Sequence, residues 1–257
     1  MGFFKDAYSN QLIVSSSANA LTNDMKKLRD MLTLKAERSG LRTACVELDI
    51  VAGSNSVDVY QTKALTKALT TVDRQSRLYI LGHGDWKSQT VGGLNAEIWA
   101  TRLIKCGLVV APKIISIVGC NAGRDLKAEI SCRVAQSLNS FASQLHLKLK
   151  DPGGLETMLF ARPYTIRAHY ERGKEGKTTH RYDGNAPKPV LEKKDGELPH
   201  GEQRKLCFCW VDGQQARKWV VYGQKETLED LQTERDFGQF AEFGALPDFG
   251  ALSDFDE

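Results

Sequence analysis

The sequence predicts an α/β fold: a mainly parallel sheet with helices on its faces, followed by a hairpin-rich β-flap. Two short apolar runs, residues 77–81 and 113–118, are rich in β-branched or aromatic residues and end at glycine, which is typical of buried parallel strands. Segments with helical periodicity lie between and around these runs. Strands that alternate with helices indicate a wound sheet that is covered by helices.

The expected elements follow one another from residue 11 onward. Strands are expected at residues 11–16, 43–49, 77–81 and 113–118, and helices at residues 22–38, 57–70, 95–106 and 126–149. Gly40 is placed to end the first helix. The last helix has apolar residues at spacings of 4, 3 and 4, which predicts one buried face made of Val134, Leu138, Phe141 and Leu145.

The pattern changes after the last expected helix. Apolar residues alternate with polar ones over residues 164–170, as in a half-exposed strand. Residues 171–205 are polar and contain several Gly and Pro, and two further strands are expected at residues 206–211 and 218–222. We therefore expect a β-flap over about residues 164–222.

The length of 257 residues is enough for one sizeable α/β domain with appendages. No apolar run reaches the length that crosses a bilayer, so no membrane span is expected. The first residues also lack the long apolar segment of a secretory signal peptide. We expect a short N-terminal segment at residues 1–10, one domain at residues 11–225 and an acidic low-complexity tail at residues 226–257.

The charge is distributed unevenly along the chain. From Glu226 onward there are ten acidic residues and one basic residue, a charge of −9, which leaves +12 on the first 225 residues of a chain with a net charge of +3. A domain this basic attracts polyanions, although the charge also serves solubility. In the tail, Phe recurs every six residues, a period of neither helix nor strand, so a mobile segment is expected.

The six cysteines point to a reducing compartment. No Cys-x-x-Cys pair is present, so a zinc ribbon or a thioredoxin-like motif is not expected, and no metal site is predicted. Cysteine is too sparse for a disulfide scaffold. Most of these thiols are therefore expected to be buried and reduced, and a catalytic thiol would need the same compartment.

A histidine and a cysteine stand at the ends of the two apolar runs. His83 follows the first run in Gly82-His83-Gly84, and Cys120 follows the second in Gly119-Cys120. Open α/β sheets place their active sites at the carboxyl ends of neighbouring parallel strands. A thiol at that edge can be deprotonated by an imidazole within hydrogen-bond reach. This context favours a catalytic dyad over a buried thiol and an unrelated loop histidine.

The glycines beside the dyad have an expected role of their own. They let a substrate backbone approach closely and leave backbone N–H groups free to stabilise a developing oxyanion. The N–H groups of Gly84 and Cys120 are the candidates for this oxyanion hole.

These motifs resemble a known family. The segments GHG at 82–84, GGLNAEIWATRL at 92–103 and ISIVGC at 115–120 are similar to the caspase-like autoprocessing cysteine protease domain of RTX-type and clostridial glucosylating toxins. The segments QLIV, VELD, YTIRAHYE and RKLCFCW follow in the family's order, so the resemblance spans about residues 11–222.

The resemblance implies roles for individual residues. Cys120 matches the nucleophile and His83 its base, in a cysteine endopeptidase that prefers leucine before the cut. Asp49 lies where some members carry an acid that orients the histidine. The alternative for Asp49 is a simple strand-end cap, and both readings remain open.

The resemblance also implies an allosteric activator, inositol hexakisphosphate, held in a basic pocket under the β-flap. The positions that match its ligands are Arg167, Lys205, Arg77, Lys177 and Lys35. Six phosphates on one ring require many converging cations, and the charge of the first 225 residues is consistent with this. For each residue the alternative is a solvated surface charge.

Family members of this kind lie inside giant toxins, whereas here the domain makes up nearly the whole chain. We therefore expect an effector that a bacterium secretes without a cleavable signal peptide and that acts on a host protein in the host cytosol. Two alternatives remain open: a non-catalytic module that binds a polyanion, and acyl transfer to an amine by the same dyad. Nucleic acid is not an expected partner of the peptidase.

The acidic tail contains a possible site of self-cleavage. Leu252 precedes Ser253, whereas Leu246 precedes Pro247 in the other copy of the repeat. Proline lacks an N–H and fits poorly as a leaving amine. Leu252–Ser253 is therefore the expected site, with an uncleaved acidic end as the alternative.

Overall fold

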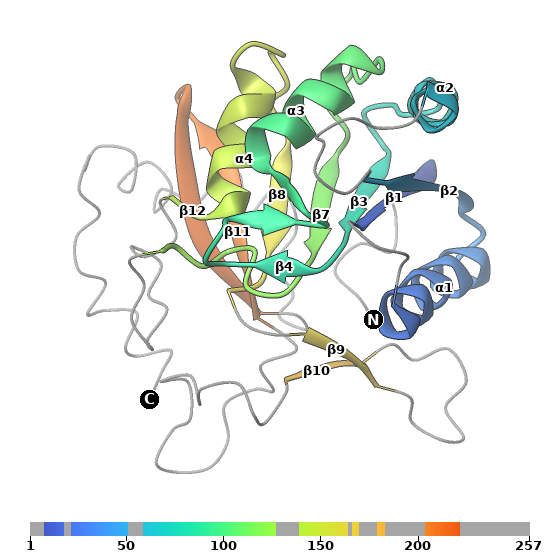
Figure 1. Ribbon diagram of the computed structural model, residues 1–257. Coiled ribbons are helices and arrows are strands. Elements are labelled where there is room, and N and C mark those ends of the chain that lie inside the picture. The colour runs from blue at the N-terminus through green and yellow to red at the C-terminus, as the bar shows by residue number, and fades with distance from the viewer. Residues whose placement is uncertain are drawn as a thin grey trace.

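The computed structural model describes residues 8–17, 22–50, 59–126, 139–163, 166–169, 179–182 and 204–221 (Figure 1). A seven-stranded sheet forms the centre, in the order β12-β11-β8-β7-β3-β1-β2. Its strands are β1 (Asn10–Ser17), β2 (Arg42–Asp49), β3 (Arg77–Leu81), β7 (Ile114–Val118), β8 (Met158–Ala161), β11 (Arg204–Val211) and β12 (Gln214–Val221).

The sheet is mainly parallel, which confirms the predicted fold class. β1 pairs in parallel with both β2 and β3, β3 with β7, and β7 with β8, whereas β11 and β12 form an antiparallel hairpin at one end. Two small antiparallel sheets accompany it. One is made of β9 (Ile166–His169) and β10 (Thr179–Tyr182), and the other of β4 (Gly84–Asp85), β5 (Thr90–Val91) and β6 (Leu94–Asn95).

Three helices cover one face of the central sheet: α2 (Val59–Leu69), α3 (Ala96–Lys105) and α4 (Phe141–Lys150). The main hydrophobic cluster lies between these helices and alternate strand residues, including Leu78 and Ile80 of β3. Trp99 of α3 is fully buried in this cluster, and its indole N–H donates to the Val91 carbonyl at 2.8 Å. Trp99 therefore ties the helical layer to the small sheet β4-β5-β6.

The first helix, α1 (Asn23–Arg38), packs on the opposite face. Met25, Leu28 and Leu32 of α1 form a second cluster with the strand residues that alternate with those of the main cluster, Tyr79 and Leu81 among them. β9 also contacts α1, so the β9-β10 hairpin lies on the α1 side of the molecule.

The helix boundaries follow their caps. Asn95 accepts the N–H of Ile98 at the start of α3, and basic residues occupy the last turn of that helix, where they complement its dipole. Ser140 accepts the N–H of Ser143 and starts α4 at Phe141. The expectation of one helix over residues 126–149 was therefore wrong at its start, because a cap interrupts it; residues 127–138 lie outside the described part.

The sheet contains a strand that the sequence reading missed. β8 is only four residues long, and its short apolar run gives no period by which to separate strand from helix. The last strand begins at Gln214, four residues before the expected start, because Asp212 and Gly213 form the hairpin turn with positive φ angles. The β11-β12 hairpin extends the central sheet.

None of the cysteines that the structure describes is part of a disulfide. Cys106, Cys207 and Cys209 are buried, Cys45 is exposed and Cys120 is half-buried, while Cys132 lies outside the described residues. Most of the described thiols are thus buried, as expected. Among the described residues, no helix is both long and apolar enough to span a membrane.

Candidate active site

The two predicted dyad residues follow neighbouring strands. β3 and β7 pair in parallel, with Leu81 opposite Val118 at their carboxyl ends. His83 follows two residues after Leu81, and Cys120 two residues after Val118. The topology therefore brings both residues to one edge of the sheet, the edge at which open α/β proteins place their sites.

The backbone of Gly84 lies directly against the backbone of Cys120. A Cβ atom at Gly84 would stand 2.8 Å from both the carbonyl carbon and the nitrogen of Cys120. Because His83 precedes Gly84, the β4-β5 hairpin that follows His83 (the histidine hairpin) and the loop that contains Cys120 are in contact through their backbones. Only glycine fits at this point.

The other glycines of these motifs also pack against the protein's own backbone. A Cβ at Gly82 would stand 2.7 Å from Gly92 Cα and 2.9 Å from the Ser16 carbonyl, and one at Gly119 would stand 3.1 Å from the Gly82 carbonyl. The sequence reading assigned these glycines to close approach by a substrate. In the structure, Gly82 and Gly119 allow the ends of β1, β3 and β7 to approach one another.

The N–H of Gly84 is directed away from the hairpin. Gly84 is opposite Val91 in the β4-β5 ladder, and Gly92 donates to the His83 carbonyl at 2.7 Å. This pattern marks Gly84 and Val91 as a non-hydrogen-bonded pair, in which the peptide groups point outward from the two strands. The Gly84 N–H is therefore not used within the β4-β5 ladder, and its role as an oxyanion donor stays a prediction.

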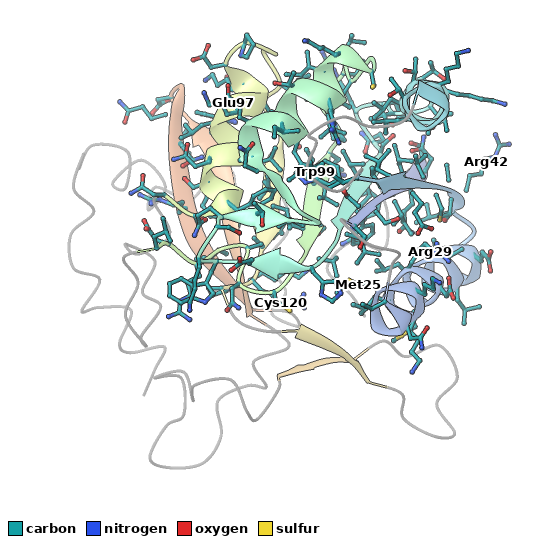
Figure 2. The ribbon with its side chains drawn as sticks, viewed as in Figure 1. Met25, Arg29, Arg42, Glu97, Trp99 and Cys120 are labelled. Atoms are coloured by element: carbon teal, nitrogen blue, oxygen red, sulfur yellow. The ribbon has the colours of Figure 1, made fainter. Side chains whose placement is uncertain are left out.

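Cys120 is half-buried at the edge of the α1-side cluster. It packs against the cluster that contains Leu81, Val118 and, from α1, Met25; Figure 2 labels both Cys120 and Met25. The thiol therefore has an apolar wall on one side and remains partly accessible, as a nucleophile must be.

The imidazole of His83 is exposed and has a hydrogen-bond partner that the sequence reading missed. Its Nε2 lies 3.0 Å from the Oγ1 of Thr22. Thr22 is the N-cap of α1 and also accepts the N–H of Met25 at 3.4 Å. The sequence marked residue 22 only as a helix start, because nothing local connects it to a residue 61 positions away.

A side-chain clamp joins the histidine hairpin to the loop after Cys120. The amide of Gln89 donates to the Trp86 carbonyl at 2.6 Å and to the Arg124 carbonyl at 2.9 Å. The guanidinium of Arg124 stands over the Trp86 ring at 4.0 Å, a cation–π distance. Gln89 lies in the turn with a positive φ of 52°, and its side chain reaches the loop at the Arg124 carbonyl.

A family profile matches the part of the chain that contains these strands, glycines, histidine and cysteine. The profile of the Peptidase C80 family, the cysteine peptidase domain of RTX and clostridial toxins, matches residues 10–177. The chain belongs to the Peptidase C80 family. It is a cysteine peptidase, and therefore a hydrolase with a protein substrate. A comparison with curated proteins found no match.

Membership of this family confirms the resemblance and removes the non-catalytic alternative. The individual residue roles remain predictions. For Asp49, the structure describes the backbone, which pairs with Ser17 at the end of β2. β1 separates β2 from β3, so Asp49 lies one strand farther from His83 than Ser17 does.

The structure describes the elements that carry four of the five predicted activator ligands. Arg77 starts β3 and Lys205 lies in β11, where it is 7% exposed. Lys35 lies on α1 and Arg167 on β9, but their side chains, like all of Lys177, lie outside the described residues. Strand alternation puts Arg77 on the face of Tyr79 and Lys205 on the face of Cys207, which is the α1 face in both cases.

Proposed function

We propose that this peptidase is an endopeptidase in which Cys120 is the nucleophile and His83 the general base, that inositol hexakisphosphate activates it, and that it cleaves after leucine. The observation that carries the dyad is the contact between Gly84 and the Cys120 backbone at the shared end of β3 and β7. This contact holds the residue before Gly84 and the thiol loop at one place.

The reaction passes through a thioester. His83 takes the proton of Cys120 Sγ, and the thiolate attacks the scissile carbonyl. The N–H groups of Gly84 and Cys120 stabilise the oxyanion. The imidazolium then gives its proton to the leaving amine, which departs with the C–N bond broken. Water, deprotonated by His83, hydrolyses the thioester and restores the thiol.

Alanine substitutions test the dyad. Cys120→Ala and His83→Ala should each lower kcat/KM on a leucine-containing peptide by about a thousandfold or more, the loss typical of nucleophile and base removal. Cys45→Ser is the matched control because Cys45 is an exposed thiol on β2, hydrogen-bonded only weakly at 3.6 Å to Thr33. A Cys120→Ala protein as active as wild type would end the proposal.

Buried cations on the α1 face support the activator. Lys205 and Arg162 are both nearly fully buried, at 7% and 4% exposure, and Arg77 stands between two rings, 4.9 Å from the centroid of Tyr8 and 5.0 Å from that of Tyr79. Burial of a cation is costly, and a bound polyphosphate would reduce that cost. Such a ligand would stabilise the α1 face of the sheet at β8 and β11.

A thermal melt tests the activator without a substrate. At a ligand concentration of about 100 times Kd, inositol hexakisphosphate should stabilise the protein by roughly 2.7 kcal/mol. Lys205→Gln should reduce the shift. Lys67→Gln, the same charge change at an exposed site on α2, should leave the shift intact. Absence of any shift in the wild type would remove the activator from the proposal.

The finer substrate proposal is a host protein that is cut after leucine in the host cytosol, by an effector that a bacterium secretes. The family's substrate class and the partly apolar wall around Cys120 support it. Peptides that differ only in having Leu, Val or Lys before the cut test the preference. Mass spectrometry of the products, with a free amine added, separates hydrolysis from acyl transfer.

A further inference from the structure

The hydrogen bond between Thr22 and His83 links the catalytic edge to the N-terminus of α1. Thr22 Oγ1 stands 3.0 Å from His83 Nε2 and 3.4 Å from the backbone nitrogen of Met25. The same hydroxyl therefore serves two partners, the helix as its N-cap and the imidazole as a neighbour.

The hydrogen-bonding capacity of the Thr22 hydroxyl limits how it can pair with His83. A threonine hydroxyl accepts two hydrogen bonds and donates one. Met25 N–H uses one acceptor position. The contact with His83 is then either a hydrogen donated by Thr22 to Nε2, or a hydrogen donated by Nε2 to the remaining acceptor position of Thr22.

The chemistry of the dyad distinguishes the two. A base that removes the thiol proton must present an unprotonated ring nitrogen to it. Because Nε2 faces Thr22, Nδ1 is the ring nitrogen left for Cys120. Neutral His83 must then carry its proton on Nε2, which donates it to Thr22.

We infer that Thr22 is a positioning residue for catalysis: it accepts the Nε2–H of His83, sets the tautomer and orients the ring so that Nδ1 receives the thiol proton. This inference rests on the proposed role of His83. The Nε2–H···Oγ1 bond persists throughout the cycle, since only Nδ1 gains and loses a proton. The neutral hydroxyl of Thr22 thus orients the imidazole, as the third group of a catalytic triad orients its histidine.

This arrangement also couples the site to α1. The hydroxyl that orients His83 is fixed in place as the N-cap of α1. The same helix contributes to the cluster against which Cys120 packs. A displacement of the first turn of α1 would therefore move the partner of the general base.

Two substitutions at residue 22 test the role. Thr22→Val removes the hydroxyl at nearly constant shape and should lower kcat about tenfold, the value of one well-oriented hydrogen bond, with KM changed by less than about twofold. Thr22→Ser keeps the hydroxyl and should retain kcat within about twofold. Equal kcat values for wild type and Thr22→Val would overturn the inference.

Loss of the helix cap is a separate effect and has its own control. Asn95→Ala removes the equivalent cap of α3, which accepts the Ile98 N–H at 2.9 Å and does not contact His83. It should lower Tm about as much as Thr22→Val does, with kcat unchanged below the melt. If Asn95→Ala lowers kcat equally, the effect of Thr22 is only on stability.

A spectroscopic measurement tests the tautomer directly. In long-range ¹H–¹⁵N spectra of the wild-type protein, neutral His83 should show a protonated Nε2 and an unprotonated Nδ1. The opposite tautomer would overturn the inference even if Thr22→Val is slow. Labelling of wild-type Cys120 by an electrophile keeps the cases separate: an unlabelled wild type contradicts the proposed function, whereas a labelled one with the wrong tautomer contradicts only the role of Thr22.

Discussion

Gly84 lies so close to Cys120 that a single methyl group cannot be added there. The contact is backbone against backbone, so no flexible side chain can yield to make room. Residues at the two strand ends are therefore held at one separation by the chain, independently of their side chains.

Gly84→Ala should abolish activity and destabilise the fold. The added Cβ would push the hairpin away from Cys120, and overpacking of this kind costs about 1–3 kcal/mol. Peptide turnover and a thermal melt measure the two effects. The control is Gly40→Ala, where no atom lies within 4 Å but φ is +70°, so strain lowers stability without touching the site. Full activity of Gly84→Ala would contradict the packing described above.

His146 is a buried titratable group on α4 that catalysis does not use. It is fully buried and stacked on Trp210 at 4.6 Å, and its ring nitrogens contact the Thr157 carbonyl and the Gln215 amide, both at 2.8 Å. The carbonyl requires an N–H from Nε2, so Nδ1 accepts from Gln215. Burial lowers the pKa of His146 from 6.5 to about 4.

This pKa predicts how stability depends on pH. The native state favours neutral His146, so its contribution is fully present above about pH 6.5 and is lost as pH falls toward 4. Between pH 7 and pH 5 the wild type should lose about 2 kcal/mol of unfolding free energy through this residue. Urea unfolding at both pH values measures it. His146→Gln, which does not titrate, should show a smaller loss, and an equal loss in both proteins would refute the assignment.

At the scale of elements, the hairpin and the nucleophile loop act as one unit. Gln89 bonds to carbonyls in both, and Trp86 stacks with Arg124 across them. Trp99 supports the same hairpin from α3 through the Val91 carbonyl. The hairpin is thus fixed on two sides, toward the core and toward Cys120.

Gln89→Ala should loosen the clamp and lower kcat/KM about tenfold, because the hydrogen bond that joins the hairpin to the Arg124 carbonyl is lost together with the bond to the Trp86 carbonyl within the hairpin. Ser88→Ala is the matched control in the same turn: its hydroxyl donates to Asp85 at 2.7 Å and lowers the pKa of that carboxyl, but makes no described contact with the loop. Steady-state kinetics of both variants measure the effect. Similar rates for Gln89→Ala and wild type would show that the loop holds its place without the clamp.

The elements that the sequence predicted well are those with a period or a cap. Buried strands such as β3 and β7 are recognisable in the sequence as apolar runs that end at glycine. Their parallel pairing predicts that His83 and Cys120, which follow them, lie at the same edge of the sheet. β8 is too short to show a period. The contacts of Thr22 and Gln89 are long-range, over 61 and 35 positions, so local pattern holds no trace of either.

At the scale of the whole molecule, the peptidase domain and the C-terminal segment have opposite net charges. The first 225 residues carry +12 and the rest −9. Residues 222–257 lie outside the part of the chain that the structure describes, and the charge of the tail is known from its sequence. Its negative charge is attracted to a basic domain, which raises its local concentration near that surface.

Self-cleavage should occur at Leu252–Ser253 and not at Leu246–Pro247, since a proline after the scissile bond lacks the backbone N–H of an extended substrate and its ring fits poorly as a leaving amine. After incubation with inositol hexakisphosphate, intact mass should show loss of the residues from Ser253 to Glu257. Cys120→Ala should keep its full mass, and Leu252→Lys should block the cut. An unchanged wild-type mass, under conditions where Cys120 reacts with an inhibitor, would rule this cleavage out.

The central claim is that Cys120, activated by His83, is the nucleophile of a C80 peptidase. Labelling with a leucine-bearing electrophilic peptide, followed by mass spectrometry of the labelled fragment, tests it most directly. We predict one adduct, on Cys120, formed faster with inositol hexakisphosphate and much more slowly in His83→Ala. An adduct on the exposed Cys45 in place of Cys120, or no adduct with the activator present, would contradict the account.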